Sequence, residues 1–228
     1  PTLASASSSM KAEALLSNGG KKYPRHRNPF PSLTVLHLSS NSICALPSLR
    51  LNALGHLLRI LNLANNQIQK IEGLEDLSCL EELYLDHNRI KYIAPRSFTG
   101  LQNIRKLCLK ENGLKCLSHF SPLIRLESLQ LENNRITELA EVVKLAAHPT
   151  LRVINLLGNP IGRKQVYRPM MLRHCRLLSS LDGSNINMAE RDHVDYLFSP
   201  VDENAAFGQT SVGIPSKAHF HERTNHRI

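Results

Sequence analysis

LEELYLDHNRI (residues 80–90) and LESLQLENNRI (residues 126–136) spell nearly the same eleven letters, 46 positions apart. Both fit the skeleton L-x-x-L-x-L-x-x-N-x-I, and such self-similarity must be examined before any secondary structure is assigned. The skeleton occurs six times, and its copies begin at Leu33, Leu58, Leu80, Ile104, Leu126 and Leu151. Successive copies therefore start 22 to 25 residues apart. A fixed period of roughly 20–50 residues is typical of solenoids and other arrays, so the repeat decides the fold.

Apolar residues alternate with other residues in the first half of each repeat, which is the period of a β-strand. The paired apolar residues then face inward, and each fully buried aliphatic side chain contributes about 1.5–3 kcal/mol before entropy is subtracted. These pairs are Leu36/Leu38, Leu61/Leu63, Leu83/Leu85, Leu107/Leu109, Leu129/Leu131 and Ile154/Leu156. In the second half an apolar residue recurs every third position, as in Ile68, Ile71 and Leu74, which predicts a 3₁₀-like or short helical return. The pattern predicts an α/β fold, a right-handed solenoid with short parallel strands on its concave face and short helical or 3₁₀ segments on its convex face.

One asparagine occupies the same position in every repeat. A buried amide both donates and accepts, so it satisfies backbone groups that are left open where the chain turns away from its strand. Loss of one such amide should cost about 1–3 kcal/mol. We therefore predict a structural asparagine ladder made of Asn41, Asn66, Asn88, Asn112, Asn134 and Asn159.

The side chains between the leucines point away from the core and line the concave surface of the predicted sheet. Six strands about 4.8 Å apart span roughly 24 Å, enough to hold a helix or an extended segment of a partner. Apolar and charged residues are mixed there, as in protein–protein interfaces. The alternative for any one residue is a merely solvated side chain, because few contact residues carry binding energy. The predicted partner-binding residues are Val35, His37, Ile60, Asn62, Glu82, Tyr84, Asp86, Lys106, Cys108, Lys110, Gln130, Glu132 and Asn155.

Over about residues 33–198 these features resemble the short-repeat class of leucine-rich repeat proteins. Members of that class include the leucine-rich regulatory subunit of type-one protein phosphatase, the spliceosomal A-prime protein and an axonemal dynein light chain. The segment NPIGRKQVYRPMMLRHCRLLSSLDGSNINMAER (residues 159–191) resembles the C-terminal cap of the class. Such a cap covers the strand edge that the last repeat exposes. Within it, Asn187 and Glu190 predict a capping box that opens a final helix, which presents Val194, Leu197 and Phe198 to the core.

The repeats and the cap divide the chain into four parts. Residues 1–32 form a basic arm predicted to be flexible, residues 33–161 form the six repeats, residues 162–200 form the cap, and residues 201–228 form a flexible tail. The stretch KKYPRHR (residues 21–27) would suit an acidic partner such as nucleic acid or a tubulin tail, although a solvated linker is favoured. The chain lacks an initiator Met, which we interpret as an excerpt of a longer protein or a processed chain.

The composition indicates in which cellular compartment the protein resides and which kinds of site it lacks. Five cysteines, an odd number without a CxxC pair, predict reduced thiols in a cytosolic or nuclear protein. The chain has no apolar run of about 18 residues, so we predict no contact with a membrane. It also has no P-loop, no G-x-G-x-x-G, no G-x-S-x-G and no H-E-x-x-H, so we predict no catalytic residue, no metal site and no cofactor.

The predicted function is that of a non-catalytic scaffold, a monomeric domain of a larger chain. It would bind a protein partner of unknown identity through its concave face. Within the resemblance, the favoured setting is cytoplasmic and either cytoskeletal or ciliary. The first alternative is a nuclear scaffold of ribonucleoprotein assembly, which would reach nucleic acid through a ribonucleoprotein partner, and the second is a regulator that docks on a phosphatase. One scaffold hosts many functions, so the resemblance specifies the fold more closely than the role.

Overall fold

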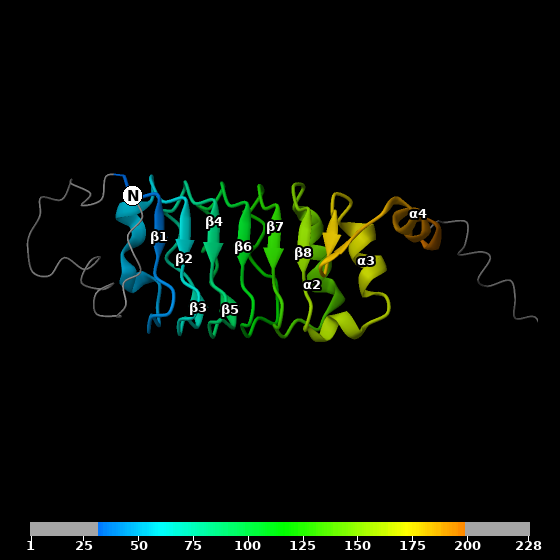
Figure 1. Cartoon of the computed structure of the whole chain (residues 1–228), viewed down its shortest axis with the longest axis horizontal. Coiled ribbons are helices and arrows are strands. Elements are labelled where there is room, and N and C mark those ends of the chain that lie inside the picture. The colour runs from blue at the N-terminus through cyan, green and yellow to red at the C-terminus, as the bar shows by residue number, and fades with distance from the viewer. Residues whose placement is uncertain (1–31, 199–228) are drawn as a thin grey trace, which may run out of the picture.

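The repeat spacing returns the chain once per repeat to the same sheet. In the computed structural model, which describes residues 32–198, the repeats stack side by side into a solenoid (Figure 1). The repeats contribute β1 (Val35–His37), β2 (Ile60–Asn62), β4 (Glu82–Tyr84), β6 (Lys106–Cys108), β7 (Ser128–Gln130) and β8 (Val153–Asn155). The sheet continues into β9 (Ser180–Leu181) and β10 (Ser184–Asn185) in the order β1-β2-β4-β6-β7-β8-β9-β10. All neighbouring pairs are parallel except β9 and β10, which form an antiparallel hairpin.

The return segments on the convex side vary in structure from repeat to repeat. They contain the 3₁₀ helices η1 (Pro47–Leu49), η2 (Leu51–Leu54), η3 (Leu145–Ala147) and η4 (Pro160–Arg163), and the α-helix α2 (Leu139–Lys144). The second and third repeats instead carry short parallel strands, β3 (Lys70–Ile71) and β5 (Tyr92–Ile93). The 3₁₀ helix expected after Ile68 is therefore absent, because Lys70 and Ile71 pair with β5 and the chain then turns at Gly73, whose φ is +74°.

The core is one continuous column of apolar side chains. Every residue of the six predicted leucine pairs is at most 3% exposed and belongs to a single cluster of buried residues. Phe98 fills the convex half of the third repeat and packs edge-on against Phe120 of the fourth, with ring centroids 5.5 Å apart. A single repeat could not bury these side chains, so cohesion comes from stacking.

The asparagine ladder forms the hydrogen bonds that the sequence predicts. Asn88 shows the pattern, because its Nδ2 donates to Leu63 O at 3.0 Å and Leu85 O at 3.1 Å while its Oδ1 accepts from Ile68 N at 3.0 Å. Each ladder amide thus links its own strand end to the turn of the preceding repeat. Asn66, Asn112, Asn134 and Asn159 make the equivalent bonds. Asn41, in the first described repeat, donates to Leu38 O at 2.9 Å, and its Oδ1 has no partner within residues 32–198.

The residue before each ladder asparagine is left-handed. Ser40, Asn65, His87, Glu111 and Asn133 have φ values between 50° and 57°, and Gly158 has a φ of +75°. This conformation turns the chain sharply out of the strand and aims the next side chain into the ladder. At Gly158 a Cβ would lie 2.0 Å from Asn133 Oδ1, so a larger residue there would require the Asn133 side chain to move.

The C-terminal end is covered by α3 (Tyr167–His174), the β9–β10 hairpin and α4 (Met188–Leu197) (Figure 1). Asn187 caps α4 by accepting a bond from Glu190 N at 2.8 Å, as predicted. The carboxylate of Glu190 does not complete the predicted box, because it binds the Arg168 guanidinium in a bidentate pair. Val194 is buried and Phe198 packs against the core, but Leu197 is 49% exposed, so its predicted inward orientation is wrong. Leu197 is three residues after Val194, but it is the last residue of α4, and Phe198 packs against the core at that end of the helix.

The predicted arm (residues 1–32) and tail (residues 201–228) lie outside the described residues, apart from Ser32. Within residues 32–198, no helix has the length and apolarity needed to cross a membrane. The same residues contain no group of three or more His, Cys, Asp or Glu side chains placed to hold a metal ion.

Candidate partner-binding surface on the concave sheet

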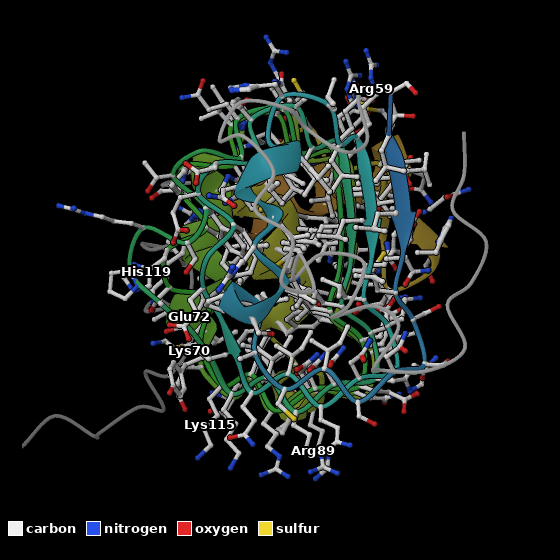
Figure 2. The ribbon with its side chains drawn as sticks, turned by 90° about the vertical axis from the view of Figure 1, so that its left-hand side faces the viewer. Arg59, Lys70, Glu72, Arg89, Lys115 and His119 are labelled. Atoms are coloured by element: carbon white, nitrogen blue, oxygen red, sulfur yellow. The ribbon has the colours of Figure 1, made fainter. Side chains whose placement is uncertain are left out.

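The register of the sheet aligns the predicted surface residues into three parallel rows. Val35, Ile60, Glu82, Lys106, Ser128 and Val153 form the entrance row, and His37, Asn62, Tyr84, Cys108, Gln130 and Asn155 form the central row. The residues two positions later, Ser39, Ala64, Asp86, Lys110, Glu132 and Leu157, form the exit row. Figure 2 looks along the solenoid, with the strands of this sheet at the right and the return segments at the left.

All thirteen predicted partner-binding residues lie in these rows. Eleven of them are half-buried, His37 is exposed and Cys108 is buried. The rows are therefore brought together as the alternation predicts. Their binding role stays a prediction.

Tyr84 stands at the centre of the first polar cluster. Its hydroxyl donates to Glu82 Oε2, and Lys106 Nζ lies 5.0 Å from the centroid of its ring. Burial, followed by the bond to Glu82, raises the pKa of Tyr84, and the contact with Tyr84 raises the pKa of Lys106. The cluster thus holds an aromatic ring between a carboxylate and an ammonium group, which fixes its orientation on the concave face.

A second polar cluster joins the exit row to the central row. Lys110 Nζ lies 2.7 Å from Glu132 Oε1, and the same oxygen accepts from Asn155 Nδ2 at 2.8 Å. Lys110 N donates to Asp86 Oδ1 at 2.8 Å, whereas burial raises the pKa of Asp86. Glu132 Oε2 is buried and has no partner among residues 32–198. Because a buried acceptor without a donor is costly, Glu132 would gain a hydrogen bond if its side chain turned outward toward a donor on a partner.

Cys108 differs from the other central-row residues. It is 3% exposed but does not belong to the core cluster, so its neighbours on the concave side cover it. Burial raises the pKa of its thiol to about 12. A thiol with that pKa stays protonated at neutral pH and lacks the reactivity of a nucleophilic cysteine. Cys108 therefore offers little surface of its own in this structure, and its role in partner binding stays a prediction.

Apolar side chains border the polar centre at both ends. Val35 and Ile60 lie at the N-terminal end, and Val153 and Leu157 lie at the C-terminal end, where Leu157 is 53% exposed. A shallow pocket of about 320 Å³ opens beside Leu157. It is lined by Leu156, Leu157, Gly158, Asn159, Pro160, Gly162, Arg163 and Asp182. The concave surface therefore combines an ordered polar centre with apolar ends, as a protein interface does.

A set of exposed cations lies outside the concave rows, and the repeat skeleton does not single it out. Arg89, Lys91, Lys115 and Arg135 follow the ladder asparagines by one or three residues and are exposed. Figure 2 shows Arg89 and Lys115 at the lower edge of the solenoid, pointing away from the core. The only signal in the sequence was their recurring offset from the ladder, in N-R-I-K, N-G-L-K and N-R-I.

Comparisons with known proteins agree with this architecture. Family models described as leucine-rich repeats match residues 31–90, 78–136 and 125–206. A leucine-rich repeat protein of Leptospira interrogans has a similar structure, with a TM-score of 0.54 and 23% identity, covering 73% of this chain and 47% of that one. At this identity the likeness shows the fold alone.

Two relatives are similar in sequence. A probable U2 small nuclear ribonucleoprotein A′ of Caenorhabditis elegans is 30% identical over 139 residues, which cover 61% of this chain and 46% of that protein. The α subunit of geranylgeranyl transferase type 2 of Homo sapiens is 34% identical over 103 residues, which cover 45% of this chain and 18% of that protein. The chain thus spans about half the length of the first relative and a smaller share of the second.

Proposed function

Because the chain belongs to the leucine-rich repeat family, we propose that it is a non-catalytic scaffold that binds another protein through its concave face. The observation that carries this proposal is the pair of ordered polar clusters between apolar ends on one continuous sheet. Pre-organised side chains reduce the entropy that binding must overcome. Tyr84 is the strongest anchor, because aromatic residues dominate the energetics of interfaces.

The polar centre also selects the chemistry of the partner. Glu132 Oε2 lacks a donor within residues 32–198, and Glu132 and the exposed Leu157 each follow the paired residues Gln130 and Asn155 by two positions. A partner helix or strand with an Arg or Lys beside an apolar residue would satisfy both groups. Such a segment would cover the C-terminal half of the concave surface.

The non-catalytic part of the proposal rests on what the described residues offer. Cys108 is a buried thiol with a raised pKa, so it stays protonated at neutral pH. The transferase subunit matches over only 18% of its own length, which is too little to carry an activity to this chain. We therefore propose that the surface binds a partner protein and does not catalyse a reaction.

The relatives bear on the cellular setting. The name of the Caenorhabditis elegans relative favours the nuclear alternative, a scaffold in a ribonucleoprotein. The cytoskeletal or ciliary setting, the cytoplasmic location and the phosphatase-docking alternative remain predictions from the resemblance. We therefore propose assembly with a protein of a nuclear ribonucleoprotein as the second candidate function.

The test compares two variants by affinity purification from nuclear and cytoplasmic extracts. The concave variant is Tyr84→Ala/Lys106→Glu, and the matched control is Ile124→Ala/Arg96→Glu, which removes one exposed large side chain and reverses one unpaired cation outside the concave rows. Circular dichroism and thermal unfolding establish that both variants fold. Proteins retained by wild type and control but lost with the concave variant are then purified and titrated by calorimetry.

We expect the concave variant to lose at least about 30-fold in affinity for the purified partner, which corresponds to one interface anchor of about 2 kcal/mol. Recovery of the partner from the nuclear extract would favour the ribonucleoprotein setting, and recovery from the cytoplasmic extract would favour the cytoskeletal one. Equal affinities for wild type, control and concave variant would refute the concave site.

A further inference from the structure

The edge of the solenoid that follows the asparagine ladder carries unpaired positive charge. We call Arg89, Lys91, Lys115 and Arg135 the ladder-edge cations. They are exposed, they come from three consecutive repeats, and none has an acidic partner within 4.0 Å among residues 32–198. Lys91 and Lys115 occupy the same position in adjacent repeats, so two like charges lie on neighbouring turns. Such pairs are unfavourable unless something neutralises them.

The opposite edge of the same repeats handles its charges differently. There the residues that precede the strands alternate in sign, with Arg59 paired to Glu81 at 2.9 Å and Arg105 paired to Glu127 at 3.1 Å. Figure 2 shows Arg59 at the upper edge, across the solenoid from Arg89 and Lys115. One edge therefore neutralises itself, and the other does not.

The imbalance accounts for the charge of the whole described solenoid. Residues 32–198 contain 20 Lys/Arg and 15 Asp/Glu, an excess of five. The six residues after each ladder asparagine contain seven of these bases and two of these acids, also an excess of five. The two acids, Glu72 and Glu138, are already paired with Lys70 at 2.6 Å and Lys164 at 3.7 Å. All the net positive charge thus lies on this edge.

An exposed aromatic residue directly follows one of the ladder-edge cations in the sequence. Tyr92 is 53% exposed and sits on β5 directly after Lys91. Lys70 Nζ lies 5.8 Å from the centroid of its ring, and the register of β3 and β5 pairs the two residues. Cations that track a backbone, combined with an aromatic platform for a base, are the elements with which proteins bind single-stranded nucleic acid.

We propose that the ladder edge binds single-stranded nucleic acid, with the ladder-edge cations on its phosphates and a base stacked on Tyr92. An acidic polypeptide would use the same charges, but exposed cations together with an exposed ring are the combination that single-stranded nucleic acid uses, which favours nucleic acid. The site lies outside the concave rows, so it stands independently of the proposed protein partner. It spans the third to fifth repeats, with further cations at Arg163 and Lys164 of the sixth.

The experiment uses the full chain and a fluorescent 12-nucleotide oligouridylate, with binding followed by anisotropy at 50 and 200 mM salt. The edge variant is Lys91→Glu/Lys115→Glu/Arg135→Glu. The matched control, Arg50→Glu/Arg96→Glu/Arg125→Glu, makes the same change in net charge with exposed cations outside the edge. Tyr92→Ala removes the stacking platform, and Tyr92→Phe retains it. All five proteins keep residues 1–31, so the basic arm contributes equally.

Four phosphate contacts to a single strand predict a slope of about −2.8 for log K against log salt, which is roughly a 50-fold loss between the two salt concentrations. The edge variant should reduce the steepness of this slope by about 2, whereas the control should keep the wild-type slope. Tyr92→Ala should weaken binding by roughly 5-fold or more, and Tyr92→Phe should bind like wild type.

Two results would overturn the proposal. Equal slopes for the edge variant and the control would assign the binding to a different part of the chain. A polyglutamate peptide that competes as well as the oligouridylate, together with no loss for Tyr92→Ala, would make the edge a site for acidic protein segments. Circular dichroism of each variant ensures that a loss of binding is not a loss of fold.

Discussion

Asn88→Ala removes one rung of the asparagine ladder, and the structure determines which groups lose their partners. The wild-type amide donates to Leu63 O and Leu85 O and accepts from Ile68 N. Alanine supplies none of these bonds. The cost therefore depends on which of the three backbone groups finds another partner.

The two carbonyls are protected because neighbouring rungs also reach them. Leu63 O still accepts from Asn66 Nδ2 at 2.9 Å, and Leu85 O still accepts from Asn112 Nδ2 at 2.9 Å. Only Ile68 N–H is left without a partner, in a buried turn. One orphaned buried donor costs about 1–3 kcal/mol, and we expect Asn88→Ala to lower the free energy of unfolding by this amount.

Asn41→Ala is the matched control from the same ladder. Its Oδ1 has no partner in the described residues, and Leu38 O keeps its bond from Asn66 at 2.9 Å. Because no backbone donor within residues 32–198 depends on it, Asn41→Ala should cost less than about 1 kcal/mol. Urea unfolding followed by circular dichroism measures both, with m values compared because repeat arrays can unfold in stages. Equal costs for the two variants would refute the reasoning that the turn donor, and not the amide itself, sets the energy.

Asn88→Asp sharpens the test. An aspartate still accepts from Ile68 N but points a second oxygen at Leu63 O and Leu85 O, so burial and the two carbonyls should raise the pKa of the new carboxyl. The protonated form is then favoured by the folded state, and the penalty grows as pH rises above the unfolded pKa of about 3.9. We expect Asn88→Asp to be less stable than Asn88→Ala at pH 7 and to recover stability toward pH 4. A cost that does not change with pH would contradict this account.

Three further predictions concern stability. Glu111→Asn should stabilise the folded chain by roughly 0.5–1 kcal/mol, because Glu111 has a φ of +50°, which asparagine adopts more readily. The half-exposed contact of Glu111 with His87 contributes little, so its loss costs little. A lower midpoint of thermal unfolding for the variant would contradict this prediction. His148 is buried without hydrogen-bond partners in residues 32–198, and burial lowers its pKa. Its contribution to the free energy of unfolding should therefore be lost as pH falls below the unfolded pKa of about 6.5. His148→Leu should make the free energy of unfolding depend less on pH between pH of about 5 and 7. Arg168 lowers the pKa of Glu190, so the ion pair should stabilise the cap above a pH of about 4.3 and lose its effect in acid. Urea unfolding should therefore show that Glu190→Gln destabilises the chain more at pH 7 than at pH 3. An equal effect at both pH values would show that the ion pair does not stabilise the cap.

The sequence predicts the fold because each repeated residue type has one physical role. A leucine at a strand position stabilises the fold through its burial, and an asparagine at the turn stabilises it through its hydrogen bonds, so both types recur in the six repeats. The variable return segments were harder to predict. A period of three fits a 3₁₀ helix and a short strand followed by turns equally well, and the pairing of Lys70 and Ile71 with β5 decides between them.

The candidate surfaces, like the fold, could be predicted only in part from the sequence. Alternation places Tyr84 and Glu132 on the concave face, but it does not reveal that Cys108 is covered there, because coverage depends on the conformations of longer neighbours. The ladder-edge cations of successive repeats are 20 or more positions apart in the sequence and become a patch only when the repeats stack. The cellular setting has no counterpart in the repeat at all, since one scaffold serves many partners.

The two proposed surfaces use different residues of the same repeats. They can therefore be mutated separately, although they lie next to each other. In the fourth repeat Lys110 belongs to the exit row, and Lys115 on the ladder edge follows it after a single left-handed turn. A protein seated on the concave face would therefore hold any nucleic acid that it carries next to the edge. If both proposals hold, the concave variant and the edge variant should weaken their own ligands independently, and a ribonucleoprotein partner should lose affinity with either one. For that partner the two losses should add as free energies, because the mutated residues share no contacts.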